Sequence, residues 1–265
     1  MSEQIDFDPV RALVEKLRKN SGLPPLDGGG EDERAQKCPV CGGTGWEWLG
    51  YDKQLYSWVT ACKCSAVENA KRRIASSGLA DLLASCTFDG FMTREPFQAH
   101  MARKAAAFAG KVIAGEKPWF FVGGQPGCGK THVCTAICGK LLENRVDVSY
   151  FQWAEDARRL KALTNDRDFD AAILPFVGAS VLYVDDLFKA APGSKPTEAD
   201  VSLAFRILNA RYNQNKPTII SSEKMTGDLL EYDQATFSRM MQRAGEFVVN
   251  IAPDVAKNFR LYEKR

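Results

Sequence analysis

A glycine-rich loop near the middle of the chain has the clearest chemistry. Residues 124–131 read GQPGCGKT, fit the pattern G-x-x-x-x-G-K-[ST] in full, and lie between an apolar run at residues 119–122 and a helical segment. In that setting, glycines let backbone N–H groups converge on phosphate oxygens at a helix N-terminus. We therefore predict that Lys130 contacts the β- and γ-phosphates of a nucleotide and that the Thr131 hydroxyl binds Mg²⁺. The predicted nucleotide-binding positions are Gly124, Gln125, Pro126, Gly127, Cys128, Gly129, Lys130, Thr131 and the following His132.

Two carboxylates follow a second apolar run. Residues 181–184 read VLYV and precede Asp185 and Asp186. A strand that ends at such a pair delivers a carboxylate to the magnesium ion, and we assign this role to Asp185, directly or through water. Asp186 is placed to orient or deprotonate the attacking water. The alternative for Asp186 is an acid that only caps the loop.

Two further segments could complete this site. Ser221 and Ser222 follow the apolar run at residues 217–220, and they fit either a polar sensor near the γ-phosphate or a solvated strand end. Arg239 and Arg243 lie on a later helical stretch. An arginine there is either an ordinary surface charge or a finger that completes the site of a neighbouring subunit.

Four cysteines form a second candidate site. Cys38 and Cys41 are spaced C-x₂-C, and Cys62 and Cys64 follow as C-x-C. Two such pairs supply the tetrahedral sulfur set that Zn²⁺ prefers, with no position left open for a catalytic water. We predict a structural zinc site on a two-stranded ribbon that turns near residues 51–54; four buried thiols are the alternative. Cys134 and Cys138 are spaced i, i+4 and fit small core residues instead.

The surrounding elements must position these residues. Short apolar runs at residues 119–122, 146–151, 181–184, 217–220 and 247–251 alternate with segments of helix length. This alternation predicts a parallel sheet with crossover helices, hence a three-layer α/β domain. The strands of such a sheet end at one edge, so the loop and the carboxylates should meet there.

Composition sets outer limits on function. The 265 residues include 45% hydrophobic and 26% charged ones, which excludes a collagen-like or mostly disordered chain. A net charge of +2 means that any contact with nucleic acid must come from local basic patches. Because we find no membrane-spanning run and no export signal, we expect a cytoplasmic protein with reduced thiols and no membrane partner.

Three zones divide the chain. Residues 1–34 should hold an amphipathic helix around Val10–Leu17 and a flexible linker that ends in three glycines. That helix either docks on its own protein or fits a groove of a partner. Residues 35–85 should form the zinc-ribbon-like domain and a basic helix, and residues 86–265 the nucleotide-binding domain.

The order of these motifs resembles a known family. The four-cysteine knuckle, the basic helix, TFDGF at residues 87–91, GGQPGCGKTH, VLYVDDLF, KPTIISSEK and TFSRMMQR together are similar to the DnaC-like bacterial replicative-helicase loaders. These are AAA+ ATPases often carried by phages, and the resemblance covers about residues 37 to 262.

The resemblance implies a function and residue roles. It implies an ATPase that loads a hexameric, DnaB-like replicative helicase onto single-stranded DNA when replication initiates, and that assembles with ATP into a ring or spiral. It makes Lys130 and Thr131 ligands of ATP and Mg²⁺ and Asp185 and Asp186 the acidic pair. It makes Ser222 or its neighbour Ser221 the first sensor, although the family usually has an asparagine there. The remaining roles it implies are a trans-acting arginine finger for Arg239, a position near the nucleotide for Phe88 and Phe91, and DNA contacts for bases such as Arg206 and Arg211.

Two other functions fit the same residues. A transposition-helper ATPase of the IstB-like type would have almost the same nucleotide-binding domain, with DNA and a transposase as its partners. An ATP-gated adaptor whose zinc ribbon binds DNA directly is the third possibility. The knuckle and the acidic N-terminal zone favour the loader.

Overall fold

The structure, a computed structural model, describes residues 38–42, 44–51, 57–65, 79–163, 168–189 and 194–259. The chain divides into two compact units near residue 60. The expected helix around residues 10–17, the turn at residues 52–54 and most of the basic helix lie outside the described residues. Within the described residues, no helix combines the length and the apolar composition needed to cross a membrane.

The small unit contains a two-stranded sheet. Its strands are β1 (Trp46–Tyr51) and β2 (Ser57–Ala61), as the zinc-ribbon prediction requires. Large apolar side chains of this sheet remain exposed, among them Trp46, Leu49 and Val59. Exposed side chains of this kind contribute little free energy of apolar burial to the ribbon.

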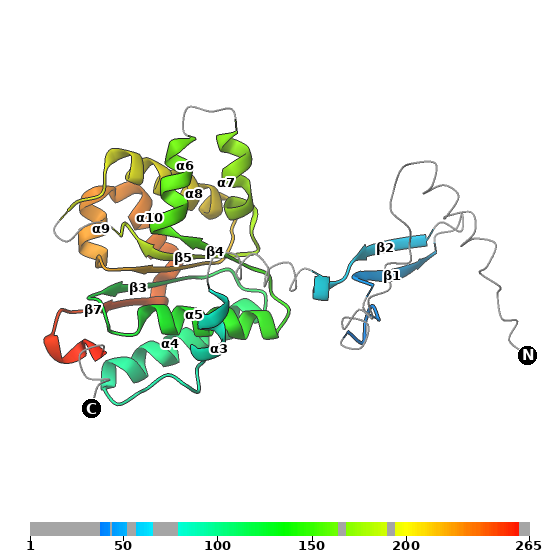
Figure 1. Cartoon of the computed structure of the whole chain (residues 1–265), viewed down its shortest axis with the longest axis horizontal. Helices are drawn as coiled ribbons and strands as arrows, with labels where there is room; N and C mark the ends of the chain where they lie inside the picture. The colour runs from blue at the N-terminus through cyan, green and yellow to red at the C-terminus, as the bar shows by residue number, and fades with distance from the viewer. Residues whose placement is uncertain are drawn as a thin grey trace, which may run out of the picture. The chain divides into compact units, whose positions relative to one another are not determined.

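The large unit is built on a five-stranded parallel sheet with the strand order β4-β5-β6-β3-β7, in which every described neighbouring pair is parallel. The predicted parallel α/β fold is thereby confirmed (Figure 1). Its strands are β3 (Trp119–Gly124), β4 (Val148–Gln152), β5 (Val181–Leu187), β6 (Thr218–Ser222) and β7 (Val248–Ile251). The other elements of this unit are α3 (Ala80–Ser85), α4 (Pro96–Ile113), α5 (Lys130–Glu143), η1 (Trp153–Ala157), α6 (Arg158–Ala162), α7 (Phe169–Gly178), α8 (Glu198–Asn213), α9 (Thr226–Tyr232), α10 (Gln234–Ala244), η2 (Gly245–Phe247) and η3 (Val255–Lys257).

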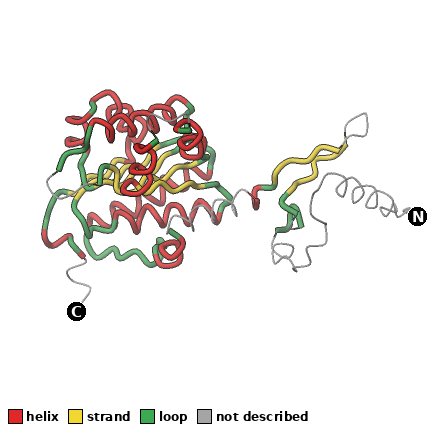
Figure 2. Tube along the Cα trace, turned by 45° about the horizontal axis from the view of Figure 1, so that its top comes forward, coloured by secondary structure: helices red, strands yellow, loops and turns green. Residues whose placement is uncertain are grey.

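Helices cover both faces of this sheet, which gives three layers. Helices α3, α4 and α5 lie on one face and α6 to α10 on the other (Figures 1 and 2). Successive strand residues point to opposite faces: in β3, Phe120 and Val122 enter the core under α4 and α5, whereas Trp119 and Phe121 enter the core under α8 and α10. A strand buried on both sides needs a continuous apolar run, which is why these strands were readable in the sequence.

The core of the large unit begins before residue 86. Leu79 is fully buried, and Leu82 and Leu83 of α3 pack against the same core as α4 and α5. Helix α3 therefore packs with the nucleotide-binding unit, although the sequence-based division assigned it to the preceding zone.

The strand order determines which residues meet. Strand β6 lies between β3 and β5, and all three run in the same direction. The loop after β3, the acids at the end of β5 and the serines at the end of β6 therefore share one edge of the sheet.

Candidate nucleotide and metal sites

The glycine-rich loop joins β3 to α5 as predicted. Gly127 and Gly129 have φ angles of +79° and +91°, a region that side-chain-bearing residues rarely occupy. A Cβ on Gly129 would also lie only 2.9 Å from the ring of Phe91. Lys130 opens the helix, is 6% exposed, and donates from Nζ to the carbonyl oxygens of Gly124 and Gln125, each at 2.8 Å. Its ammonium group therefore lies inside the loop, where it can exchange these carbonyls for phosphate oxygens.

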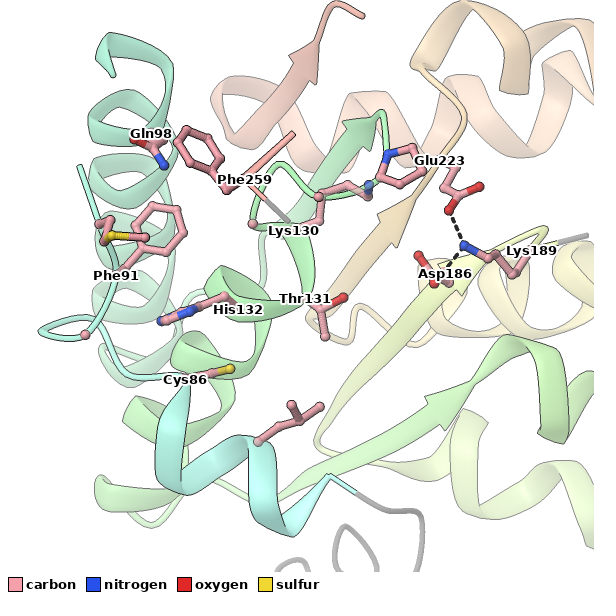
Figure 3. Close-up of a pocket in the computed structure, with 16 residues that line it drawn as sticks. Cys86, Phe91, Gln98, Lys130, Thr131, His132, Asp186, Lys189, Glu223 and Phe259 are labelled. Atoms are coloured by element: carbon pink, nitrogen blue, oxygen red, sulfur yellow. Dashed lines mark hydrogen bonds and ion pairs between the residues drawn. The ribbon is translucent and has the colours of Figure 1, made fainter. Parts of the chain in front are cut away.

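A cavity of about 470 Å³ opens beside this loop. Loop residues form one wall, a carboxylate cluster lies at one end, and apolar residues of the 82–98 region lie opposite (Figure 3). This size suits a nucleotide. The lining residues are Leu82, Cys86, Gly90, Phe91, Met92, Gln98, Pro126, Gly127, Gly129, Lys130, Thr131, His132, Asp186, Lys189, Glu223 and Phe259.

Phe88 and Phe91, both expected near the nucleotide, have different surroundings. Phe91 lines the cavity and meets the ring of His132 edge-on at 5.1 Å between centroids. His132 Nε2 lies 2.9 Å from the carbonyl oxygen of Thr87, so His132 connects the start of α5 to the segment at residues 87–91. Phe88 packs against the core under α4 and α5 rather than lining the cavity.

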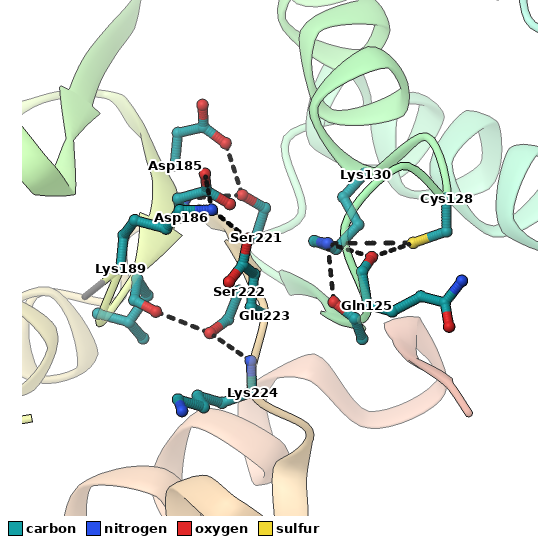
Figure 4. Close-up of polar contacts among 12 residues, drawn as sticks. Gln125, Cys128, Lys130, Asp185, Asp186, Lys189, Ser221, Ser222, Glu223 and Lys224 are labelled. Carbon is teal, nitrogen blue, oxygen red and sulfur yellow. Dashed lines mark hydrogen bonds and ion pairs between the residues drawn. The ribbon is translucent and has the colours of Figure 1, made fainter. Parts of the chain in front are cut away.

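Asp185 and Asp186 occupy different environments (Figure 4). Asp185 is 7% exposed and accepts hydrogen bonds from the hydroxyls of Tyr183 (2.6 Å), Ser221 (2.6 Å) and Tyr150 (2.9 Å). Asp186 lines the cavity. Its pKa is raised above the ordinary value, first by burial and then by the charge of Asp185, although Lys189 and Lys130 oppose the rise. Asp186 is thus the acid that faces the cavity, and Asp185 is the one held in place by hydroxyls.

A lysine and a glutamate join Asp186 in the cavity. Lys189 lies 3.5 Å from Asp186 and forms a close ion pair with Glu223 (Figure 3). Burial alone would lower the pKa of Lys189, but the hydrogen bond to Glu223 and the charge of Asp186 outweigh it and raise the pKa. Sequence reasoning did not assign a role to either residue. The signal was present in the sequence, since Lys189 follows the acidic pair and Glu223 follows the predicted sensor.

A strained turn places Lys189 there. Asp186 and Phe188 have φ angles of +52° and +60°, which cost free energy for residues other than glycine and recur at functional sites. The register between β5 and β6 shifts at this point. Phe188 is 2% exposed and packs edge-on against Trp153 and Phe237. Aromatic packing thus fixes the turn that carries Asp186 and Lys189 into the cavity.

The two serines of β6 point to different partners. The Ser221 hydroxyl donates to Asp185 Oδ1 and accepts from the backbone N–H of Asp186 at 2.9 Å. The Ser222 hydroxyl donates to the carbonyl oxygen of Leu187 at 2.7 Å and accepts from the N–H of Lys224. Of the two sensor candidates, Ser221 contacts the acidic pair, whereas the hydroxyl of Ser222 contacts backbone groups of Leu187 and Lys224.

Three arginines singled out in the sequence lie away from the cavity. Arg239 of α10 donates to Asn209 Oδ1 at 3.0 Å and lies 5.9 Å from the centroid of Tyr212. Arg206 pairs with Asp170 at 2.9 Å and is partly exposed. Arg211 corrects an expectation: it is fully buried and hydrogen-bonded to Thr218 and to backbone carbonyls. A guanidinium enclosed in this way cannot contact DNA.

Three further cysteines, Cys128, Cys134 and Cys138, behave as core residues. Cys134 and Cys138 of α5 are fully buried, and burial raises the pKa of both thiols. Cys128 in the loop is also buried, and its Sγ lies 3.0 Å from the carbonyl oxygen of Gln125. All three match the role of small apolar side chains.

The four cysteines between residues 38 and 64 lie together. Atoms Sγ of Cys38, Cys41, Cys62 and Cys64 are all within 4.8 Å of one another. In a tetrahedral site with Zn–S distances of about 2.3 Å, the sulfurs lie about 3.8 Å apart, so this cluster has the dimensions and donor atoms for zinc. A backbone hydrogen bond from Gly42 N–H to the Cys38 carbonyl, at 3.0 Å, closes the turn that presents the first pair.

Comparison with known sequences identifies relatives across most of the chain. A model of the bacterial DnaA ATPase domain matches residues 82–245. XkdC of the phage-like element PBSX in Bacillus subtilis is 30% identical over 259 residues, which cover 91% of this chain and 92% of that protein. The uncharacterised B. subtilis protein YqaM is 33% identical over 209 residues, which cover 76% of this chain and 66% of that protein. The chromosomal replication initiator DnaA of Roseobacter denitrificans is 33% identical over 166 residues, and the match spans only 35% of that longer protein.

Solved structures share the fold of the large unit. The initiator DnaA bound to AMPPCP and single-stranded DNA aligns over 68% of this chain and 53% of its own, with a TM-score of 0.53 and 19% identity. The DnaC helicase loader aligns over 64% of this chain and 97% of its own, with a TM-score of 0.51 and 20% identity. Because the ATPase-domain model matches more than half of the chain and the sheet carries the phosphate loop and acidic pair at its edge, the chain belongs to the AAA+ family of bacterial DnaA ATPase domains, here together with a four-cysteine cluster.

Proposed function

We propose that this protein is an ATP-dependent loader that places a replicative DNA helicase on single-stranded DNA when replication initiates. One observation carries the proposal: a DnaA-type ATPase domain and a four-cysteine cluster occur in a single chain. The near full-length similarity to XkdC, a protein of a phage-like element, supports a phage-type loader. The fold shared with the DnaC helicase loader agrees with it.

ATP and Mg²⁺ are the proposed ligands of the cavity. Lys130 and the loop N–H groups bind the phosphates, and Thr131 with Asp185 holds the metal, whose chemistry is to neutralise charge on the phosphate oxygens. Asp186 faces the cavity and accepts the proton of the attacking water. Ser221 fixes this arrangement, because it bonds the carboxylate of Asp185 and the backbone of Asp186 at once.

Self-assembly completes the proposal. Arg239 does not line the cavity of its own subunit, and its contacts with Asn209 and Tyr212 lie on α8. An arginine finger supplied by a second copy would stabilise the negative charge that develops on the γ-phosphoryl group. Head-to-tail contacts of this kind build a ring or a spiral.

The decisive experiment mixes the purified full-length protein separately with a DnaB-like helicase, a transposase and single-stranded DNA, each with ATP and Mg²⁺. We expect a complex of defined stoichiometry with the helicase, measured by light scattering after gel filtration, and transfer of the helicase to single-stranded DNA. Deletion of residues 1–34 should sharply weaken helicase binding while ATP binding survives. A complex with the transposase alone would instead support the transposition-helper function, and DNA binding with neither protein would support the adaptor.

A further inference from the structure

A segment near the end of the chain returns to the phosphate loop. Strand β7 pairs with β3 up to the partners Ile251 and Gly124, and the chain then continues as residues 252–259, which we name the C-terminal strap. The strap follows the strand beside the loop without an intervening helix of the α type. The strap therefore reaches the phosphate loop directly from β7, the outermost strand beside β3.

The strap holds the loop by three hydrogen bonds. The backbone N–H of Phe259 donates to the carbonyl oxygen of Gly127 at 3.0 Å. The Gln125 carboxamide donates to the Asp254 carbonyl at 2.7 Å and accepts from the Asp254 N–H at 2.6 Å. A Cβ on Gly127 would lie 2.0 Å from Asn258 Oδ1, so a larger residue at this loop position would displace the Asn258 side chain of the strap.

The strap contributes to the cavity as well. The Phe259 ring lines it, close to Gln98 and Phe91 (Figure 3). The Phe259 ring packs against the ring of Phe97, with 6.2 Å between their centroids. Lys257 Nζ lies 5.7 Å from the centroid of Phe97. Gln125, predicted as a nucleotide contact, does not line the cavity; its side chain is engaged by the strap.

We propose that the C-terminal strap positions the phosphate loop and that nucleotide binding and strap docking strengthen each other. A loop binds phosphate through inward-pointing N–H groups, and this requires its carbonyls to point outward and find other donors. The strap supplies such a donor to Gly127 and fixes the loop through Gln125. Since coupling between two binding events is reciprocal, a nucleotide that needs this loop shape must also tighten the strap. The inference rests on the proposed nucleotide binding.

A double-mutant cycle tests the coupling. AMPPCP affinity in the presence of Mg²⁺ is measured by calorimetry for the full chain, Gln125→Ala, a chain lacking residues 252–265, and the combination. We expect each single change to weaken affinity about tenfold, within the 5–150-fold range typical of such coupling. The combination should be no weaker than the truncation alone, because Gln125 acts only through the strap. Val255→Ala, at a strap residue that is 73% exposed, is the matched control and should bind like the parent.

Hydrogen exchange on the full-length protein gives a second readout that requires no variant. AMPPCP should slow exchange of the strap amides, including those of Asp254 and Phe259. Unchanged affinity of the truncated chain, additive losses in the double variant, or strap exchange that ignores AMPPCP would each overturn the strap inference alone. If the full chain binds no AMPPCP, the proposed function fails and the inference fails with it.

Discussion

Asp185 and Asp186 are adjacent in sequence yet differ in what they can do. Asp185 is enclosed by two tyrosine hydroxyls and Ser221, while Asp186 faces the cavity on a left-handed backbone. A buried carboxylate that accepts three hydrogen bonds is fixed in direction. A carboxylate at a cavity wall can approach a water molecule. This difference supports the proposed division of roles, with Asp185 as the metal ligand and Asp186 as the proton acceptor.

Variants of Asp186 and Lys130 should separate turnover from binding. Asp186→Asn removes the proton acceptor, so we expect ATP hydrolysis to fall about 10²–10⁴-fold while AMPPCP affinity is retained. Lys130→Ala should lose affinity as well, because its ammonium contacts the phosphates. Phosphate release and calorimetry measure the two effects. Hydrolysis at the parental rate by Asp186→Asn would show that this residue only caps the loop.

The two serines of β6 offer a matched pair of variants. Ser221→Ala should lower the rate of ATP hydrolysis, because Asp185 and the Asp186 backbone lose a shared partner. Ser222→Ala should leave the rate near that of the parent and reduce the free energy of unfolding by about 1–3 kcal/mol, since it leaves buried backbone groups without a partner. Urea unfolding and phosphate release distinguish the two outcomes. A larger rate loss in Ser222→Ala would return the sensor role to Ser222.

At the scale of elements, Arg211 connects three segments of the large unit. It lies on α8, donates to the carbonyls of Phe176, Val177 and Ala179 around the end of α7, and also reaches Pro217 and Thr218 at the start of β6. The last carbonyls of a helix lack partners within it, so a buried cation there satisfies them. Burial lowers the pKa of Arg211 to about 9. This residue stabilises the fold.

Arg211→Met should therefore destabilise the protein strongly. It deprives several buried carbonyls of their donor, at about 1–3 kcal/mol each, so we expect a loss of at least about 3 kcal/mol in the free energy of unfolding. Arg206→Met removes an exposed ion pair with Asp170, worth about 0–1 kcal/mol, and a cation–π contact with the Phe169 ring, worth about 0.5–1 kcal/mol at an exposed site. Urea denaturation compares the two. A small loss in the free energy of unfolding of Arg211→Met would contradict the role of Arg211 in capping the end of α7.

The cysteine-rich ribbon should depend on its metal. We expect about one Zn²⁺ per chain by metal analysis of the reduced protein, because four thiolates form a complete ligand set. Cys41→Ser should release zinc and unfold β1 and β2, since metal binding supplies most of the stability of such a unit. Unfolding of the large unit should be unchanged, as seen in its thermal transition. Freshly prepared, reduced protein without zinc would exclude this site.

At the scale of the whole molecule, the side chains that line the cavity offer lysines for the proposed phosphate binding and a carboxylate as the proposed proton acceptor. They do not include a guanidinium: among the described residues that line the cavity, the basic side chains are Lys130, Lys189 and His132. Charge that develops on the γ-phosphoryl oxygens is stabilised in related ATPases by an arginine from outside the site. A second copy is the natural source of such a residue here.

Arg239 should act between subunits. Arg239→Ala is expected to keep AMPPCP affinity and to lose most of the stimulation of hydrolysis that assembly produces, an effect worth about 10³–10⁵ in related enzymes. Mixing it with Lys130→Ala should restore part of the activity, because one subunit supplies an intact loop and the other an intact arginine. If mixed proteins co-assemble and remain inactive, Arg239 is a surface charge and Arg243 is the next candidate.

The local features of this protein can be predicted from short stretches of its sequence. Continuous apolar runs identified the strands, since a strand covered on both faces has no polar side to present. The loop from Gly124 to Thr131 and the cysteine pairs were also readable, because their chemistry depends on residues that are close along the chain. These features were sufficient for the parallel α/β fold and for the placement of the phosphate loop before α5.

Tertiary structure decided every pairing between distant segments. Ser221 rather than Ser222 reaches Asp185 because alternate residues of β6 point to opposite sides. Arg211 is buried because α8 faces the end of α7, whereas the family resemblance implied a DNA contact for it. Phe259 enters the cavity because β7 lies beside β3, and its backbone N–H bonds the carbonyl of Gly127, which lies 132 residues earlier in the sequence. Such contacts depend on strand order and facing directions, which no local pattern of residues specifies.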